Sequence, residues 1–174
     1  MQLIHDFGIS PLEYNNRGMD NDFPEVENCP SCSYPGPFPK LGYYWRNALF
    51  LRRSFRIPIC RYKCPSCKIT ISILPDFLLP YYQYSLAFIM QALRNHLIKP
   101  KRKIYHQLLQ FYLKRYFNNL NRIEAFFREC GFLEEILAKE KAIKLLEMIR
   151  TAFPKAKTFA RRFQKHFHRN FMAN

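Results

Sequence analysis

The sequence predicts an α+β protein in which a short β-rich segment precedes a longer helical one, and three observations carry this prediction. The four-residue word CPSC occurs at residues 29–32 and again at 64–67. Around these words, runs rich in β-branched and aromatic residues predict strands. Beyond residue 84, apolar residues recur every three or four positions, which is the period of a helix. A chain of 174 residues can form one medium domain or two small ones, and the change of pattern favours two.

Residues 1–28 differ from the rest of the chain in their charge. Six of them are Asp or Glu, one is Arg, and the stretch EYNNRGMDND is rich in turn-forming residues. We therefore expect an acidic, weakly structured arm. The remaining 146 residues hold 27 Lys or Arg against seven Asp or Glu, so their formal net charge of +20 exceeds the +15 of the whole chain.

Three antiparallel strands are expected between residues 29 and 74. The runs GYYWRNALFL, SFRIPICRYK and KITISIL are short, and turns or a CPSC word separate them. The segment 75–84 follows, and its prolines disfavour both a helix interior and a central strand. We predict a proline-rich hinge over 75–84 and a basic helical domain over 85–174.

About five helices are predicted after the hinge. The first has Ser85 as a plausible N-cap, carries an apolar stripe from Leu86 to Leu97 and stops before Pro100. Gly131 is expected to cap the third helix. The second and third helices together have the size of a helix-turn-helix. We expect the other four helices over about 102–116, 119–129 and 133–150, and from Pro154 onward.

The last predicted helix carries phenylalanine at every fourth position, from Phe159 to Phe171. Such a stripe is expected to pack on the preceding helices while the basic residues beside it stay in water. The same pattern also suits a helix on a membrane surface, which stays open as an alternative. No apolar run reaches the ~20 residues of a membrane span and no secretory signal is recognisable, so we expect no membrane partner and a reducing cytoplasmic location.

The repeated CPSC word predicts a metal site. In structural sites zinc binds four ligands in a tetrahedron, with thiolates at ~2.3 Å. Each C-x-x-C turn supplies two sulfurs, and the 31 residues between the words suffice for two strands that bring the turns together. Four thiolates leave no open coordination position, so the ion would hold a fold rather than catalyse a reaction. We predict a three-stranded antiparallel zinc ribbon over 29–74 with one structural Zn²⁺ bound by Cys29, Cys32, Cys64 and Cys67.

Four further residues bear on the prediction. Ser33 and Lys68 follow the second cysteine of each word, where zinc-binding turns often carry glycine. Cys60 and Cys130 lie outside the two words, and we expect both to be small buried apolar residues.

The stretches CPSCSYPGPFPKLGYYWRNA and IPICRYKCPSCKITISILPDFLLPYYQYSL resemble the transposase-like zinc-ribbon proteins of bacteria, which are found with insertion sequences. The likeness covers about residues 29–90, and NNLNRIEAFFRECGF and FPKAKTFARRFQKHF also look like relatives of this family. It implies zinc binding by the four cysteines and DNA binding in a mobile-element context. It also implies a helical part, often of helix-turn-helix type, and a bacterial protein that is associated with the nucleoid if it binds DNA. It does not imply catalysis.

No catalytic constellation is recognisable in the sequence. Seven acids follow residue 28, and six of them lie on predicted helices, where they are expected to be surface charges. The histidines of the predicted helices have no cysteine or carboxylate motif beside them. We therefore predict a protein that is not an enzyme, with an unrecognised nuclease as an open alternative.

The charge of the chain predicts a polyanionic partner. We expect duplex DNA to bind through its phosphates, with RNA as a variant because aromatic residues near Arg52 could stack unpaired bases. The alternative is a protein-interaction or regulatory subunit that docks on a larger nucleic-acid enzyme such as a transposase. The expected nucleic-acid contacts are Arg52, Arg53, Arg56, Arg61, Lys63, Lys99, Lys101, Arg102, Lys103, Lys114, Arg115, Arg122, Arg161, Arg162, Lys165 and Arg169.

Overall fold

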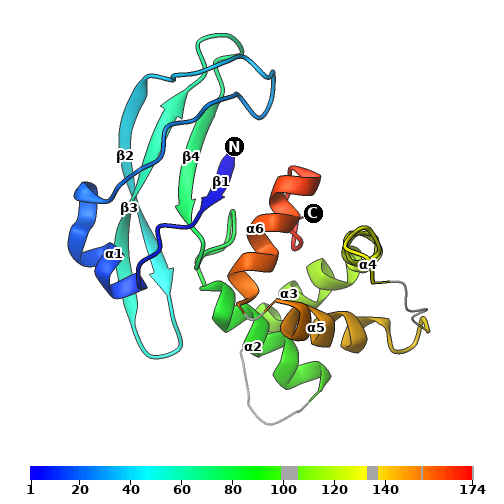
Figure 1. Ribbon diagram of the computed structural model, residues 1–174. Helices are drawn as coiled ribbons and strands as arrows, with labels where there is room; N and C mark the ends of the chain where they lie inside the picture. Colours follow the sequence, from blue (N-terminus) through cyan, green and yellow to red (C-terminus); the bar gives the residue numbers. More distant parts are fainter. Residues whose placement is uncertain (99–105, 133–136, 154, 174) are drawn as a thin grey trace. The chain divides into compact units, whose positions relative to one another are not determined.

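The structure is a computed structural model that describes residues 1–98, 106–132, 137–153 and 155–173. The chain divides into two compact units, Met1–Ser85 and Leu86–Asn174, and each is described by itself. Strands build the first unit and helices build the second (Figure 1). The predicted α+β class is confirmed. No helix in the described part of the chain combines the length and the apolar character that a membrane crossing requires.

A four-stranded mixed sheet forms the first unit, with the strand order β1-β4-β3-β2. The strands β2 (Lys40–Leu49), β3 (Ser54–Lys63) and β4 (Thr70–Pro75) pair antiparallel in sequence order, as predicted. The strand β1 (Gln2–His5) adds to the free edge of β4 and runs parallel to it (Figure 1). The expected three-stranded antiparallel ribbon is therefore incomplete, because a fourth, parallel strand from the amino terminus belongs to the same sheet.

The expectation of a weakly structured arm over 1–28 is wrong. Besides β1, this segment contains the helix α1 (Pro11–Arg17) and the short 3-10 helix η1 (Gly18–Asp20). Tyr14 of α1 is fully buried, and its hydroxyl donates a hydrogen bond of 2.9 Å to the carbonyl of Pro58 on β3. Burial raises the pKa of this phenol far above its usual value. A tertiary contact thus orders a segment whose composition favours turns.

Local contacts also support α1. The hydroxyl of Ser10 accepts a hydrogen bond of 3.2 Å from the backbone N–H of Glu13, which is an N-cap interaction. The ring of Tyr14 makes edge-to-face contacts with those of Phe7 and Phe23, at centroid distances of 4.9 and 6.3 Å. These aromatic contacts bury apolar surface that a solvated arm would leave in water.

The proline-rich segment 75–84 packs within the first unit. Leu78 and Leu79 are fully buried. The guanidinium of Arg46 on β2 donates hydrogen bonds to the backbone carbonyls of Leu79, at 3.5 Å, and Tyr82. The segment expected to be a hinge is therefore fixed against the sheet, and the division between the units falls after Ser85.

Five helices form the described part of the second unit, as predicted, and α2 contacts α3, α5 and α6. Residues 99–105 and 133–136, where two of the expected helices begin, lie outside the described residues. Residues 138–140 form a turn, so the fourth expected helix starts at Lys141. The helices are α2 (Leu86–Leu97), α3 (His106–Asn118), α4 (Leu120–Glu129), α5 (Lys141–Ala152) and α6 (Ala156–Phe167).

Phenylalanine rings form much of the core of the second unit. Phe159 of α6 is fully buried, and its ring lies 5.6 Å from that of Phe126 and 5.9 Å from that of Phe127 on α4. The expected packing of the α6 stripe on the preceding helices is confirmed. Phe171 does not extend the helix, because α6 ends at Phe167. The chain turns back instead and places the ring of Phe171 5.1 Å from that of Phe159.

The carboxy-terminal end of α4 is closed by a Schellman motif, and Gly131 supplies the predicted cap. Gly131 has a φ of 89°, its N–H donates to the carbonyl of Arg128, and the N–H of Phe132 donates to the carbonyl of Phe127. The rings of Phe127 and Phe132 touch at a centroid distance of 5.5 Å, the apolar contact that usually accompanies this motif. Cys130 is exposed here, so the expectation that it is buried is wrong.

A single residue, Asn119, joins α3 to α4. Its amide is fully buried and donates hydrogen bonds to the carbonyls of Arg115, at 2.8 Å, and Ala173, at 2.7 Å. Its side-chain oxygen accepts a bond of 3.2 Å from Arg122. This connection is shorter than the three or four residues that join the helices of a helix-turn-helix. The helix-turn-helix expected from the second and third helices stays a prediction.

Candidate metal centre and basic surfaces

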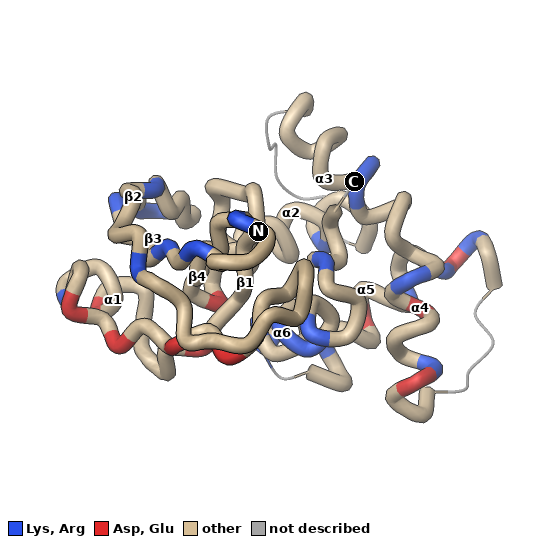
Figure 2. Tube along the Cα trace, turned by 90° about the horizontal axis from the view of Figure 1, so that it is seen from above, with Lys and Arg blue, Asp and Glu red and all other residues tan. Residues whose placement is uncertain are grey.

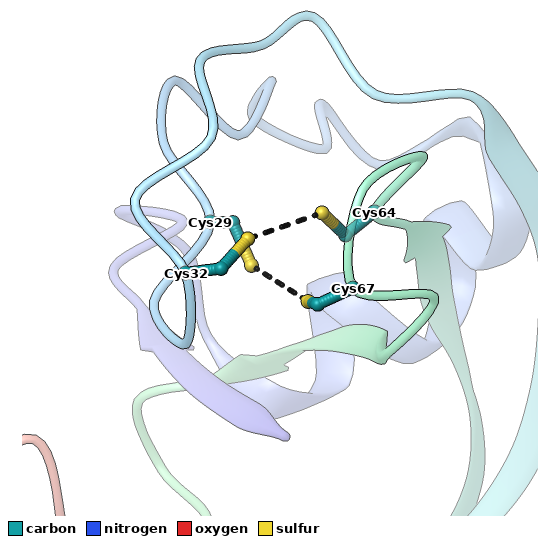
Figure 3. Close-up of side chains that lie close together, drawn as sticks. All are labelled: Cys29, Cys32, Cys64 and Cys67. Atoms are coloured by element: carbon teal, nitrogen blue, oxygen red, sulfur yellow. Dashed lines mark hydrogen bonds between the residues drawn. The ribbon is translucent and has the colours of Figure 1, made fainter.

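The four cysteines of the CPSC words come together in the first unit. Their sulfur atoms all lie within 4.8 Å of one another, and those of Cys29 and Cys67 are 3.6 Å apart while those of Cys32 and Cys64 are 3.7 Å apart (Figure 3). Four sulfurs at ~2.3 Å from a central ion, at the corners of a tetrahedron, lie about 3.8 Å from one another. The cluster could therefore hold a metal ion such as zinc.

The two CPSC turns have the same backbone geometry. In the first, the N–H of Ser33 donates a hydrogen bond of 2.8 Å to the carbonyl of Cys29. In the second, the N–H of Lys68 donates one of 3.1 Å to the carbonyl of Cys64. Ser33 and Lys68 have φ values of 58° and 63°, a left-handed conformation that favours glycine. Ser33 and Lys68 therefore occupy the two positions, directly after the second cysteine of each word, where the positive φ favours glycine.

Backbone amides also point at the sulfur atoms. Mainly through the hydrogen bond from the Tyr34 amide, the pKa of Cys32 falls to about 6. The Ile69 amide lowers the pKa of Cys67 in the same way, but burial and the other three thiols outweigh it and raise that pKa to about 11. Without a cation, four neighbouring sulfurs cannot all be ionised at neutral pH, because their negative charges repel one another. A divalent cation would remove this conflict.

Gly36 is a residue of this site that sequence reasoning missed. A Cβ atom at Gly36 would lie 2.3 Å from the carbonyl oxygen of Val26, so the close approach of the two backbones requires glycine. The N–H of Gly36 donates a hydrogen bond of 2.5 Å to the carbonyl of Glu27, which closes the loop that carries Cys29 and Cys32. The signal was present in the sequence, since a Gly-Pro pair follows the first CPSC word by four residues.

The predicted nucleic-acid contacts of the first unit lie at opposite ends of β3. Arg52, Arg53 and Arg56 are exposed at and beside the turn between β2 and β3. Arg61, which is half-buried, and Lys63, which is exposed, lie at the other end, next to the metal centre. The strand is ten residues long, so at ~3.3 Å per residue the two groups are separated along most of its length.

Acidic residues are absent from the stretch 28–75, which holds eight Lys or Arg. The acids of the first unit lie between Asp6 and Glu27 and at Asp76. Figure 2 shows them around α1 and along the segment that follows it, whereas basic residues mark β2 and β3. Within the first unit the hairpin of β2 and β3 is therefore basic, whereas the segment before Asn28 is acidic.

In the second unit, the structure describes seven of the predicted contact residues. Lys114, Arg122, Arg162 and Lys165 are exposed. Several of the basic residues rest on aromatic rings: the guanidinium of Arg115 lies 4.4 Å from the ring centre of Phe111. The residues Arg115, Arg161 and Arg169 are half-buried. The residues Lys99, Lys101, Arg102 and Lys103 lie outside the described part of the chain.

A hollow of about 560 Å³ lies between α4 and α6 and brings Arg162 and Lys165 together. The imidazole of His166 pairs there with Glu129, with 2.7 Å between Nε2 and the carboxylate oxygen. The thiol of Cys130 also lines this hollow. The sequence did not predict that His166 and Glu129 pair, because residues on two helices meet only once the helices pack.

The comparisons with known proteins give one match. The family model described as a domain of unknown function (DUF6431) matches residues 29–116, just over half of the chain. The matched stretch holds both CPSC turns, the strands β2 to β4, and α2. A search of curated proteins and a search of solved structures found no match.

Proposed function

The chain belongs to the DUF6431 family, and we propose that it is a zinc-stabilised, non-enzymatic protein that binds duplex DNA through phosphate contacts. The observation that carries this proposal is the distribution of charge. Residues 86–174 hold 19 Lys or Arg against six Asp or Glu, a formal net charge of +13. Residues 1–85 hold nine against seven, a net charge of +2. A strongly cationic helical unit attracts a polyanion and releases its counterions on binding.

The proposed zinc ion acts on the fold of the first unit. All four ligands are thiolates, so no coordination position stays open for water or a substrate. Bound zinc with four thiolates carries a net charge of −2, which offsets the +2 of the first unit. Within that unit the hairpin of β2 and β3, which carries most of the basic residues, can then contact a polyanion. The metal would stabilise the end of this hairpin that lies away from its connecting loop.

The proposed context is a bacterial mobile element, and it rests on the resemblance of residues 29–90 to transposase-like zinc-ribbon proteins. This context favours DNA over RNA as the ligand. The nucleic acid would be bound and not cut, since in the described residues no cluster of carboxylates accompanies the basic surfaces.

Titration of labelled nucleic acid with the full-length, zinc-loaded chain tests the proposal. A duplex of ~30 base pairs, the matching single-stranded DNA and a double-stranded RNA serve as probes, and fluorescence anisotropy gives the affinity between 50 and 200 mM salt. If six to ten phosphates are neutralised, affinity for the duplex falls by about 10³–10⁵ over that range. Equal affinity for the RNA would overturn the preference for DNA, and a chain that fails to bind any of the probes would overturn the whole proposal.

A matched pair of variants separates specific contacts from bulk charge. Replacing Arg162 and Lys165 by Ala removes two exposed cations and should make the log–log salt slope shallower by about two. Replacing Arg128 and Lys141 removes the same charge, but Glu124 already pairs with both, at 2.7 and 2.5 Å. The second change should leave the slope nearly unchanged. Identical slopes for the two variants would count against phosphate contacts on α6.

Docking on a larger enzyme is the second candidate function. The edge strand β2 favours it, because Leu41 and Trp45 are 45% and 50% exposed on that strand. Exposed apolar residues on a sheet edge can receive a partner. The test adds an acidic competitor protein to the chain bound to a protein partner and, separately, to the chain bound to DNA. Displacement of the protein partner alone would support this second function beside the first.

A further inference from the structure

The turn between β2 and β3 presents one large apolar side chain among arginines. Four residues, Phe50, Leu51, Arg52 and Arg53, join the strands, and the N–H of Phe50 donates a hydrogen bond of 2.9 Å to the carbonyl of Arg53. The side chain of Leu51 is 61% exposed at the end of this loop. Arg52 and Arg53 beside it are exposed as well.

Turn chemistry does not explain this choice of residues. Hairpin loops favour Gly, Asn, Asp and Pro, and the loop has none of them. A leucine that stays largely in water contributes little to folding, since it buries little apolar surface. In the described part of the chain no carboxylate pairs with Arg52, Arg53 or Arg56, so their charges are uncompensated there. The loop therefore exposes one apolar side chain, that of Leu51, beside two exposed arginines.

The loop is also held rigidly at its base. The ring of Phe50 lies 5.6 Å from that of Phe55 and 5.8 Å from that of Phe77. On the outer side of β2, the N–H of Leu49 donates 2.8 Å to the carbonyl of Gln83, and the carbonyl of Leu49 accepts 2.8 Å from the N–H of Ser85. A loop fixed on both sides loses little conformational entropy when it binds.

One exposed face of the hairpin continues from the loop toward the middle of the strands. Arg56 on β3 lies opposite Asn47 on β2, and both side chains are exposed. Trp45 lies two residues further along the same face and is 50% exposed. Arg and Asn are residues that contact phosphates and base edges, so this strip suits the same ligand as the loop.

We infer that this hairpin is a DNA-bending element, in which Leu51 enters the minor groove as a wedge between base steps while Arg52 and Arg53 lie along the groove walls. Architectural proteins use this combination: an apolar side chain unstacks a step and kinks the duplex toward the major groove, while arginines contact the minor groove. A two-stranded ribbon is wider than the undistorted minor groove of ~6 Å, so we expect only side chains of the connecting loop to enter the groove. The inference rests on the proposed DNA binding and names a contact that produces a bend.

The test measures bending separately from affinity. An A·T-rich duplex of ~20 base pairs carries a donor and an acceptor dye at its ends and 2-aminopurine at a central TA step, because such steps unstack easily. Binding of the parent chain should raise energy transfer between the ends and raise the 2-aminopurine fluorescence. In the Leu51→Ala variant both signals should fall to less than roughly half, while affinity drops by no more than about fivefold.

Three variants serve as references. Leu51→Met retains a long apolar side chain and should keep both signals. Leu12→Ala removes a leucine that is 47% exposed on α1, and it should behave as the parent does. The double variant Arg52→Ala, Arg53→Ala should make the log–log salt slope shallower by about two. Zinc content and circular dichroism check that each variant is folded.

The outcomes separate this inference from the proposed function. Loss of both signals in Leu51→Ala, with retention in Leu51→Met and Leu12→Ala, supports the wedge. A parent chain that binds the duplex without either signal, or a Leu51→Ala variant with unchanged signals, overturns the wedge and leaves DNA binding in place. A parent chain that does not bind the duplex at 50 mM salt overturns both.

Discussion

Residues 1–85 and residues 86–174 are units of similar length that close their cores by different means. The first unit gathers four thiols at one end of a sheet, where they could hold a metal ion. The second packs phenylalanine rings from α4, α6 and the chain end, and no cluster of three metal-ligating residues is found in its described part. Each unit should therefore respond to its own perturbation, chelation in one case and cavity formation in the other.

The units also differ in where they carry charge. The first is close to neutral and separates most of its acids from its bases along the chain. The second has more bases than acids in four of its five described helices, and α4 has two of each. Screening by salt weakens contacts between exposed charges and leaves buried apolar contacts almost unaffected. Salt should therefore change ligand binding far more than it changes the stability of either unit.

The largest effect is expected from loss of the metal. Replacing Cys64 by Ser should release zinc and unfold the first unit, because structural zinc contributes roughly 10–16 kcal/mol in zinc-finger peptides. The helices α2 to α6 of the second unit should persist. Elemental analysis and far-ultraviolet circular dichroism would follow the metal and the helices, and nuclear magnetic resonance would follow the strands.

The exposed cysteine at 130 provides the control for that change. A Cys130→Ser variant should keep its zinc and both units, since Cys130 lies outside the cluster. Absence of zinc from the parent chain, or melting of the helices together with the strands, would break the comparison between the units.

A cavity in the aromatic core should produce the reverse pattern. Phe159→Ala removes a fully buried ring and should destabilise the second unit by about 3–5 kcal/mol. Zinc content should not change. Denaturant unfolding followed at 222 nm gives the free energy of unfolding. Phe117→Ala serves as the control, because Phe117 is 47% exposed, and it should cost less than about 1 kcal/mol.

The buried corner between α3 and α4 should give an intermediate effect. Asn119→Ala removes an amide that bonds to two backbone carbonyls, and it should destabilise the second unit by about 1–3 kcal/mol because those carbonyls lose their partner. The neighbouring Asn118 is exposed, so Asn118→Ala is a matched control. Equal loss of stability in the two variants would contradict the role assigned to Asn119.

The smallest effect is expected at the left-handed residues of the CPSC turns. Ser33→Gly should stabilise the zinc-loaded first unit by about 0.5–1 kcal/mol, because glycine adopts a positive φ without steric strain although it also gains entropy in the unfolded chain. Ser31→Gly, in the same turn, replaces an exposed serine that has no positive φ and should be slightly destabilising. Thermal unfolding at a fixed zinc concentration measures both, and a stabilising Ser31→Gly would refute this account.

The candidate site was predictable where its chemistry is local. The CPSC words named all four cysteines, because two ligands from one short turn are recognisable by spacing alone. The basic residues were predictable in kind but not in place. Sequence gives no distance between Arg53, in the loop before β3, and Arg61, near the other end of that strand. Gly36 was missed because its role is a close approach between two backbone segments.

The sequence by itself determined the three antiparallel strands, the five helices of the second unit and the four cysteines, because periodicity and ligand spacing act over a few residues. Tertiary structure alone decided that QLIH pairs in parallel with β4 and that PLEYNNR is a helix, since short segments take their conformation from the surface they bury. It also decided which apolar residues stay in water. The exposure of Leu51 at the hairpin end depends on where β2 and β3 stop pairing, and no local pattern specifies that point.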